Sequence, residues 1–179
     1  MIQLRDCYIE KIRISDAVGI HHLMTSNAER FQRYFPKTLE QNSTIVLAQS
    51  FAEQKVQEFT NKEEFLFVIK QKTTKKVVGL IYIKALDWIK RQGEFAYCLA
   101  SKYEGKGVMS SGIRALSGYA FTNLKLNLLQ IIVFKENIGS VKVAQNCNFV
   151  WQRTLLKEHT PPNELPLDME LYELNILNF

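Results

Sequence analysis

The sequence predicts an α/β protein of the α+β type, in which a mixed sheet is covered by helices. Segments with apolar residues at helical spacing alternate with short runs that are rich in Val, Ile, Leu and Phe and have the composition of strands. A hydrophobic share of 46% is large enough to bury a core. The length of 179 residues matches one domain, which we expect to span residues 1–179.

The first third of the chain is expected to hold one strand followed by helices. Residues 8–14 have the composition of a strand, and Ser15-Asp16 then offers an N-cap to a first helix. Residues 26–29 have the spacing of a capping box, which predicts a second, short helix that ends at Pro36. From residue 43 to about residue 61 the apolar positions recur at helical spacing and predict a longer amphipathic helix.

From residue 65 the period changes to that of strands. Residues 65–70 and 77–85 are expected to form a hairpin around a polar turn, and residues 91–100 a third strand. The remaining expected elements are a helix over 108–121, a strand over 128–134, a helix over 138–146, and strands over 149–157 and 169–176. This order predicts a mixed sheet with helices on its faces.

Charge and composition exclude several classes of protein. A net charge of +5 over 179 residues is too small for a nucleic-acid footprint, so no direct nucleic-acid binding is expected. No apolar run approaches the ~20 residues of a membrane-spanning helix, and no signal peptide is visible, so no membrane association is expected. Three scattered cysteines without a Cys-x-x-Cys pair predict a reduced, cytoplasmic protein without a metal site.

The most informative segment covers residues 100–111, where a strand ends, Gly105 and Gly107 follow, and a helix begins. Such a loop lets successive N–H groups point at one spot, which suits a phosphate or diphosphate, and Lys102 and Lys106 add positive charge. A Walker loop is excluded because its string of residues is absent. A dinucleotide fingerprint is excluded because Ser110 stands where the third glycine belongs. A turn that binds nothing remains the alternative.

Three segments, in this order, resemble the GNAT superfamily of acyl-CoA-dependent N-acetyltransferases. Residues 93–99 (Gly-Glu-Phe-Ala-Tyr-Cys-Leu) are similar to a strand of its RimJ/RimL-like branch, the ribosomal-protein-alanine N-acetyltransferases. Residues 102–107 are similar to the diphosphate loop Gln/Arg-x-x-Gly-x-Gly/Ala, with Lys102 at the first position. Residues 137–149 are similar to the Asn-x-x-Ser helix and Gly-Phe that follow, with Asn148 replacing the glycine. The resemblance implies the GNAT fold: a mixed, largely antiparallel twisted sheet of about six to seven strands, with helices on both faces.

The resemblance also implies a site for acetyl-CoA as cosubstrate, without a metal. The strand that carries Glu94 would splay away from the strand over 128–134, and the pantetheine arm would lie in the gap. Residues 98–100 would offer free backbone groups to pantetheine, residues 105–110 would hold the diphosphate, and Asn137 would contact the pantetheine region. The implied cofactor-binding residues are Cys98, Leu99, Ala100, Gly105, Lys106, Gly107, Val108, Met109, Ser110 and Asn137.

Two residues are implied in the chemistry. Glu94 is the only carboxylate of residues 94–100 and is the candidate base, directly or through a water; an ordinary solvent-facing Glu is the alternative. Many relatives use a tyrosine acid seven residues after the Asn, but Ala144 stands there. Ser140 is therefore expected near the thioester sulfur, as hydrogen-bond donor or proton relay, unless it only satisfies the first turn of its helix. Cys147 has no histidine nearby in sequence and is expected to be a core residue.

The resemblance implies an acetyl-CoA-dependent N-acetyltransferase that works by direct attack of a primary amine in a ternary complex. The branch suggests a protein or peptide N-terminal α-amine as acceptor. A small-molecule amine (polyamine, amino sugar or amino acid) and a non-catalytic CoA-binding module are the alternatives, and both a monomer and a homodimer are compatible with the sequence. The acceptor groove is expected between residues 26–39 and the loop 159–168, with Phe31, Tyr34, Phe35 and Trp88 as candidate lining residues.

Overall fold

A computed structural model describes residues 1–179. Its strands pair into one sheet in the order β1-β2-β3-β4-β5-β6-β8-β7. All neighbouring strands run antiparallel except β5 and β6, which run parallel. The strands are β1 (Ile2–Gln3), β2 (Cys7–Lys11), β3 (Phe65–Gln71), β4 (Val77–Asp87), β5 (Gln92–Leu99), β6 (Leu128–Val133), β7 (Val150–His159) and β8 (Leu167–Asn175).

The sheet has eight strands, one more than the expected six to seven. The additional strand, β1, contains only two residues, which is too short to produce a recognisable alternation of apolar and polar side chains. The first expected strand is too long, because the chain leaves the sheet after Lys11 and forms a 3₁₀ turn at Ile14–Asp16.

Six α-helices accompany the sheet: α1 (Ala17–Thr25), α2 (Ala28–Phe31), α3 (Pro36–Glu40), α4 (Ile45–Asn61), α5 (Val108–Thr122) and α6 (Ile138–Asn146). The prediction for Pro36 was wrong, since this residue begins α3 instead of ending α2. Proline is tolerated in the first turn of a helix, where its missing N–H has no helical partner to lose. None of the helices combines the length and apolar character needed to cross a lipid bilayer.

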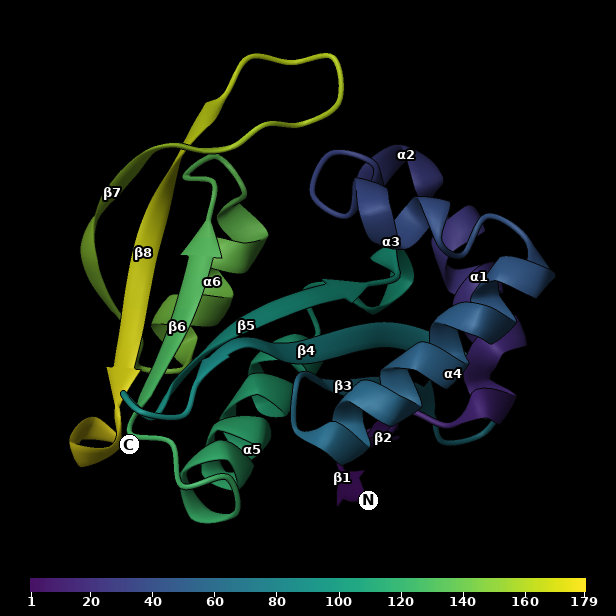
Figure 1. Ribbon diagram of the computed structural model, residues 1–179, viewed down its shortest axis with the longest axis horizontal. Coiled ribbons are helices and arrows are strands. Elements are labelled where there is room, and N and C mark those ends of the chain that lie inside the picture. The colour runs from purple at the N-terminus through teal and green to yellow at the C-terminus, as the bar shows by residue number, and fades with distance from the viewer.

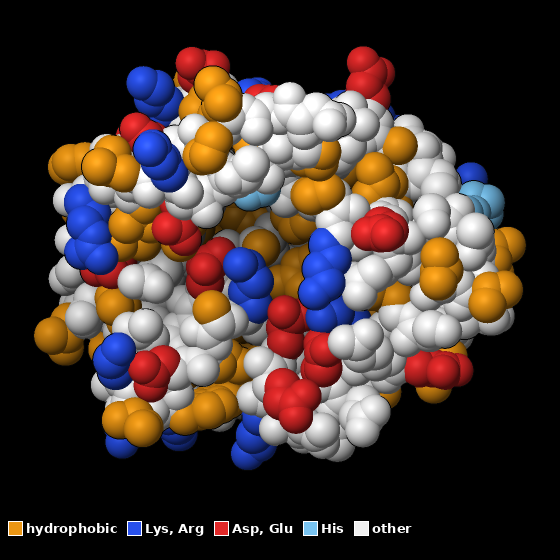
Figure 2. Space-filling view, turned by 45° about the horizontal axis from the view of Figure 1, so that its top comes forward, with side chains coloured by type: hydrophobic (Ala, Val, Ile, Leu, Met, Phe, Trp, Pro, Cys, Tyr) orange, Lys and Arg blue, Asp and Glu red, His pale blue; other side chains and the backbone are white.

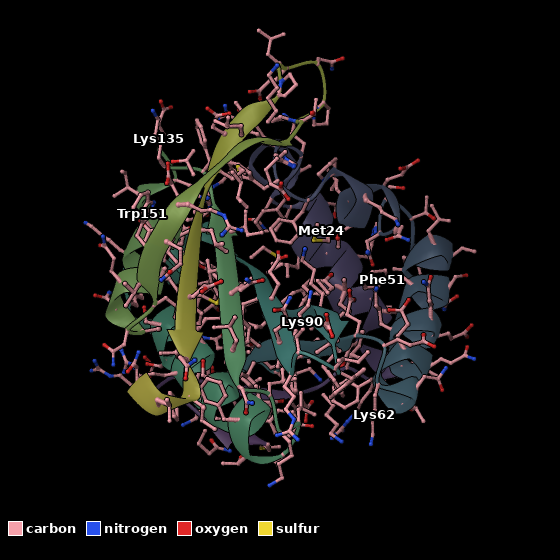
Figure 3. The ribbon with its side chains drawn as sticks, turned by 60° about the vertical axis from the view of Figure 1, so that its left-hand side comes forward. Met24, Phe51, Lys62, Lys90, Lys135 and Trp151 are labelled. Carbon is pink, nitrogen blue, oxygen red and sulfur yellow. The ribbon has the colours of Figure 1, made fainter.

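Helices cover both faces of the sheet, as expected (Figure 1). On one face, the apolar side of α5, including Ile113 and Leu116, packs against strand residues such as Ile81. On the other face, α1 and α4 pack against different residues of the same strands. Figure 3 shows Met24 of α1 and Phe51 of α4 inside this second layer, where both side chains are buried.

The parallel pair β5–β6 is short and opens into a gap. Its register runs from Gln92 opposite Leu128 to Phe95 opposite Ile131 and then stops. Beyond this point β5 continues on β4 as far as the pair of Leu99 with Gly79, whereas β6 continues on β8. The two strands diverge as a V in Figure 1. The sheet therefore has an open seam after Phe95, where the resemblance implied one.

Candidate active site

Two cavities lie on either side of the open seam. The Glu94 cavity has a volume of about 670 Å³ and lies between β4–β6, α3 and α4. The Gly105 cavity has a volume of about 900 Å³ and reaches from the seam to the N-termini of α5 and α6. Five residues line both cavities, which therefore meet at the seam: Tyr34, Phe35, Tyr97, Asn137 and Ser140.

The loop before α5 presents unpaired backbone donors to the Gly105 cavity. Gly105 and Gly107 have φ of 67° and 74°, a left-handed conformation that glycine adopts without strain. The first helical bond of α5 runs from the amide of Ser111 to the carbonyl of Gly107, so the amides of Val108, Met109 and Ser110 have no helical partner. No side chain caps this end. The positive end of the helix dipole thus faces a cavity that can take an anion.

The lysines of this loop lie elsewhere. The ammonium groups of Lys102 and Lys106 lie over the ring of Tyr103, at 5.2 and 5.9 Å from its centroid. Neither residue lines the Gly105 cavity, although Lys106 was predicted to bind the cofactor. The basic residues that do line this cavity are Arg30, Arg33 and Lys142, which come from the α2 region and α6.

The seam itself exposes backbone groups of β5, but not of all the residues predicted. The N–H of Ala100 donates to the carbonyl of Val78 at 2.8 Å, and its carbonyl accepts from Tyr103, so Ala100 has no free backbone group. In an antiparallel ladder every second residue faces the same neighbour, so the backbone of Cys98 also faces β4. By the same alternation, the backbone groups of Leu99 and Tyr97 face the seam. Sequence reasoning included Ala100 and missed Tyr97, because the register depends on β4, a separate strand.

Asn137 and Ser140 lie at the start of α6, where the two cavities meet. The side-chain oxygen of Asn137 caps the helix by accepting from the amide of Ser140 at 3.2 Å. Its side-chain NH₂ group makes no hydrogen bond within the chain and remains available as a donor. The hydroxyl of Tyr97 donates to the carbonyl of Ser140 at 3.3 Å, and burial raises the pKa of this phenol. These contacts hold the first turn of α6 at the seam.

Glu94 lines only the cavity named after it. Its side chain is 15% exposed, and its Oε1 accepts from Nζ of Lys84 on β4 at 2.8 Å. Glu94 and Lys84 are direct neighbours across the β4–β5 ladder. The lysine is 37% exposed, so it stays in contact with solvent while it orients the carboxylate. Figure 2 shows a hollow on this side of the molecule, with apolar side chains inside and charged side chains around it.

The lining of the Glu94 cavity is rich in carboxylates. Besides Glu94 it includes four carboxylates and only three lysines: Glu58, Glu63, Glu64 and Glu158, with Lys37, Lys55 and Lys84. Nζ of Lys55 donates to both Glu58 and Glu64 at 2.7 Å. Burial lowers the pKa of Lys55, but the hydrogen bonds and negative charges of Glu58 and Glu64 together outweigh it and the net pKa is raised. The cavity therefore has an excess of negative charge, although the whole chain is positive.

The predicted acceptor groove coincides with this cavity only in part. Tyr34, Phe35 and His159 line it, whereas Phe31 lines the Gly105 cavity and Trp88 lines neither. Helix α4 supplies a wall that sequence reasoning did not anticipate, because its polar face reads as an ordinary solvated surface.

The segment between α2 and α3 contacts the end of β7 and the loop that follows it. The rings of Tyr34 and His159 stack at 6.0 Å, Nε2 of His159 contacts the carbonyl of Arg33 at 2.8 Å, and Arg33 pairs with Glu164 at 2.8 Å. The loop between β7 and β8 thus contacts the segment between α2 and α3.

The cysteines do not offer a reactive thiolate. Burial raises the pKa of the Cys98 thiol to about 12, and it also raises the pKa of Cys147. The thiol of Cys147 donates to the carbonyl of Ser110 at 3.2 Å. All three cysteines are buried, which agrees with the prediction of Cys147 as a core residue.

Comparison with known proteins identifies the family to which the chain belongs. The family model described as "Acetyltransferase (GNAT) domain" matches residues 7–150. Probable N-acetyltransferase YjcK of Bacillus subtilis is 23% identical over 83% of each chain. A spermidine N(1)-acetyltransferase of Vibrio cholerae is 31% identical over 47% of this chain and 49% of its own.

Solved structures share the fold at low sequence identity. The ribosomal-protein-S5-alanine acetyltransferase from Vibrio fischeri has a TM-score of 0.91 and 22% identity over 97% of this chain and 95% of its own. RimL, a ribosomal L7/L12 α-N-protein acetyltransferase in complex with coenzyme A, has a TM-score of 0.88 and 15% identity over 98% and 97%. A spermidine N-acetyltransferase from Vibrio cholerae, in complex with CoA and spermine, has a TM-score of 0.79 and 22% identity over 97% of both.

Proposed function

The chain belongs to the GNAT family of acetyl-CoA-dependent N-acetyltransferases, and from this premise we propose that it acetylates a primary amine held in the Glu94 cavity, by direct attack within a ternary complex. One observation carries the proposal: the two cavities meet where β5 and β6 part, and Tyr97, Asn137 and Ser140 line both of them there. An acyl donor in one cavity and an amine in the other would therefore touch at this place.

The Gly105 cavity fits acetyl-CoA by the chemistry of its free groups. The unpaired amides of residues 108–110 match a diphosphate, and the backbone of Tyr97 and Leu99 offers ladder positions to the amide-containing pantetheine arm. The free NH₂ group of Asn137 is a further donor near the seam. RimL was solved with coenzyme A, and the resemblance implies a pantetheine arm along β5 of this chain. When bound, acetyl-CoA supplies the thioester whose acetyl group is transferred.

Proton transfer is assigned to two residues. An ammonium must lose a proton before its nitrogen can attack, and the Glu94 carboxylate, oriented by Lys84, accepts this proton directly or through a water. The C–N bond then forms as the C–S bond breaks, and the departing thiolate takes up a proton. Ser140 lies where its hydroxyl can hydrogen-bond the sulfur or relay that proton, held there by Asn137 and Tyr97.

For the acceptor we propose the N-terminal α-amine of a protein or peptide. This is supported by the likeness to RimL, which is named as a protein α-N-acetyltransferase, and to an acetyltransferase that is named for an alanine of ribosomal protein S5. A small cationic amine is the second candidate. Its support is the excess of carboxylates in the Glu94 cavity, which attracts positive charge, and the relatives that are named for spermidine.

The test compares both acceptor classes under the same conditions. The protein is incubated with acetyl-CoA and either a panel of peptides with varied first residues or a panel of monoamines, polyamines, amino acids and amino sugars. Release of CoA and the mass of each product are measured. We expect one acetyl group on the N-terminal residue of certain peptides and none on N-terminally blocked copies. Transfer to small amines alone would select the second candidate, and no transfer to either class would refute the proposed function.

A further inference from the structure

The positive charge around the Gly105 cavity does not come from the glycine loop. Acetyl-CoA carries several phosphate charges, and neither Lys102 nor Lys106 lines the cavity. Of the basic residues that do, Arg33 is paired with Glu164, and its guanidinium also lies over the rings of Tyr34 and Phe134. Arg30 of α2 contacts the loop directly, through its ion pair with Glu104.

Arg30 pairs with the residue that directly precedes the glycine turn. Its NH2 donates to Oε1 of Glu104, and Gly105 follows at once with its left-handed backbone. Both side chains line the Gly105 cavity. They are 45% and 48% exposed, and an ion pair in this degree of contact with water contributes little to stability. The pair can therefore be exchanged for a stronger partner.

A bound diphosphate changes the balance of this pair. The negative charge of the diphosphate repels the Glu104 carboxylate. The diphosphate also offers oxygens that a guanidinium binds in bidentate fashion. We propose that Arg30 leaves Glu104 and binds the diphosphate of acetyl-CoA, which makes it a cofactor-binding residue outside the glycine loop. The inference rests on the proposed function, because it requires that acetyl-CoA occupies the Gly105 cavity.

The geometry of the loop supports this assignment. A Cβ added at Gly105 or Gly107 would meet no atom within 4 Å, so the space beside the turn is open. Unpaired amides of α5 border the same cavity, and Arg30 of α2 lines it as well. A diphosphate at the amides would thus share this cavity with the Arg30 side chain.

The test measures dissociation constants for three ligands that differ in their phosphates: CoA, dephospho-CoA, which lacks the 3′-phosphate, and pantetheine, which lacks all phosphates. Binding is measured by calorimetry at one ionic strength near 0.15 M, because screening alters such contacts. The variants are Arg30→Ala, Arg30→Lys and Glu104→Gln. Arg153→Ala, on the exposed strand β7, removes the same charge from a residue that lines neither cavity and is the control.

We expect Arg30→Ala to weaken CoA and dephospho-CoA equally, by roughly ten- to a hundredfold, the range for a lost hydrogen bond to a charged group. Pantetheine binding should be unchanged, Arg30→Lys should recover part of the loss, and Arg153→Ala should match the wild type. Glu104→Gln should bind CoA at least as tightly as the wild type, because it removes a competing carboxylate.

Several outcomes would overturn the inference. Equal weakening of CoA and pantetheine would mean that Arg30 only shapes the cavity. Loss confined to CoA, with dephospho-CoA unaffected, would place Arg30 at the 3′-phosphate. Weaker CoA binding by Glu104→Gln would mean that the Arg30–Glu104 pair itself builds the site. If the wild-type protein binds neither CoA nor dephospho-CoA, the proposed function fails and this inference fails with it, whereas the preceding outcomes leave the proposed function intact.

Discussion

Two clusters of charged side chains in this molecule are built from the same kinds of ion pair but lie in different surroundings. In the first, Nζ of Lys70 on β3 contacts Oε1 of Glu10 at 2.6 Å and Oδ1 of Asp16 at 2.5 Å, and Arg13 adds a bond to Glu10. Glu10 and Asp16 are 8% and 4% exposed, and none of the four residues lines the Glu94 or Gly105 cavity. In the second, Lys84 pairs with Glu94 and Lys55 pairs with Glu58 and Glu64, and all five residues line the Glu94 cavity.

The two groups differ in whether water or a ligand has access to their charged side chains. The Lys70 group joins β2, β3 and the turn before α1, and the side chains of Lys70, Glu10 and Asp16 are at most 11% exposed. The charges of the Glu94 cavity border a space that admits water or a ligand. We infer that the first group stabilises the fold, and that the second group is available for catalysis and for binding the acceptor.

The largest effect is expected for Glu94→Gln. An amide cannot accept the proton of the acceptor ammonium, so kcat should fall by about 10²- to 10⁴-fold. The dissociation constant of acetyl-CoA should not change, because Glu94 does not line the Gly105 cavity. The free energy of unfolding in urea should change by less than about 1 kcal/mol, since Lys84 remains solvated.

The control for this variant is Glu53→Gln, an exposed carboxylate on α4 outside the cavity, which should leave kcat unchanged. Full activity of Glu94→Gln would remove Glu94 from the mechanism. A large loss of stability would assign Glu94 to the same structural class as the Lys70 group.

The next effect is expected for Lys70→Met, and it should appear in stability. Removing one partner of a buried ion group leaves Glu10 and Asp16 without compensation, which costs about 3–5 kcal/mol in the free energy of unfolding. The variant should keep its kcat/KM under conditions where it is folded. Lys76→Met, at an exposed lysine of the neighbouring turn, should change stability by less than about 0.5 kcal/mol.

The pH dependence of this loss follows from the pKa of Lys70. Burial lowers that pKa, but hydrogen bonds to Asp16 and Glu10 outweigh burial and the net pKa is raised above 10.5. A cation with a raised folded-state pKa contributes stability that is complete below its unfolded pKa and is lost as the pH rises through the folded value. The difference between wild type and variant should be constant from about pH 6 to about pH 9 and should shrink above pH 10.5. A difference that shrinks near neutral pH would contradict this assignment.

The sequence predicted local features well and relations between distant strands poorly. Helix α6 has the predicted bounds, because the Asn137 cap and the apolar spacing are both local. Asn148 has φ of 62°, as its position in place of a glycine indicates. The open seam was implied only by the resemblance, since residues 95 and 131 are far apart in the chain.

The candidate site shows the same limit. Glu94, Asn137 and Ser140 could be named from short motifs, and the structure brings all three to the lining of one cavity. Tyr97 was missed because its alternation depends on the register with β4. Arg30 was missed because its contact with Glu104 joins segments that are far apart in the sequence, which no pattern of spacing records.

The smallest effect is expected for Lys55→Met, which tests the comparison most directly. Like Lys70→Met, this change removes an ammonium from two carboxylates, in this case Glu58 and Glu64. Here the carboxylates border a cavity and can be hydrated, so the free energy of unfolding should fall by only about 1–2 kcal/mol.

In the same variant, the Glu94 cavity should gain affinity for positively charged ligands. With Lys55 removed, the two carboxylates are free to bind a cation, so the KM of a diamine should fall by about two- to fivefold relative to a monoamine of the same length. Lys37→Met removes a lysine that lines the same cavity and forms no ion pair. It should therefore also lower the ratio of the diamine KM to the monoamine KM, but without a loss of stability. If Lys55→Met destabilised the protein as much as Lys70→Met and left the ratio unchanged, the cavity ions would be structural too, and the division between the two groups would not hold.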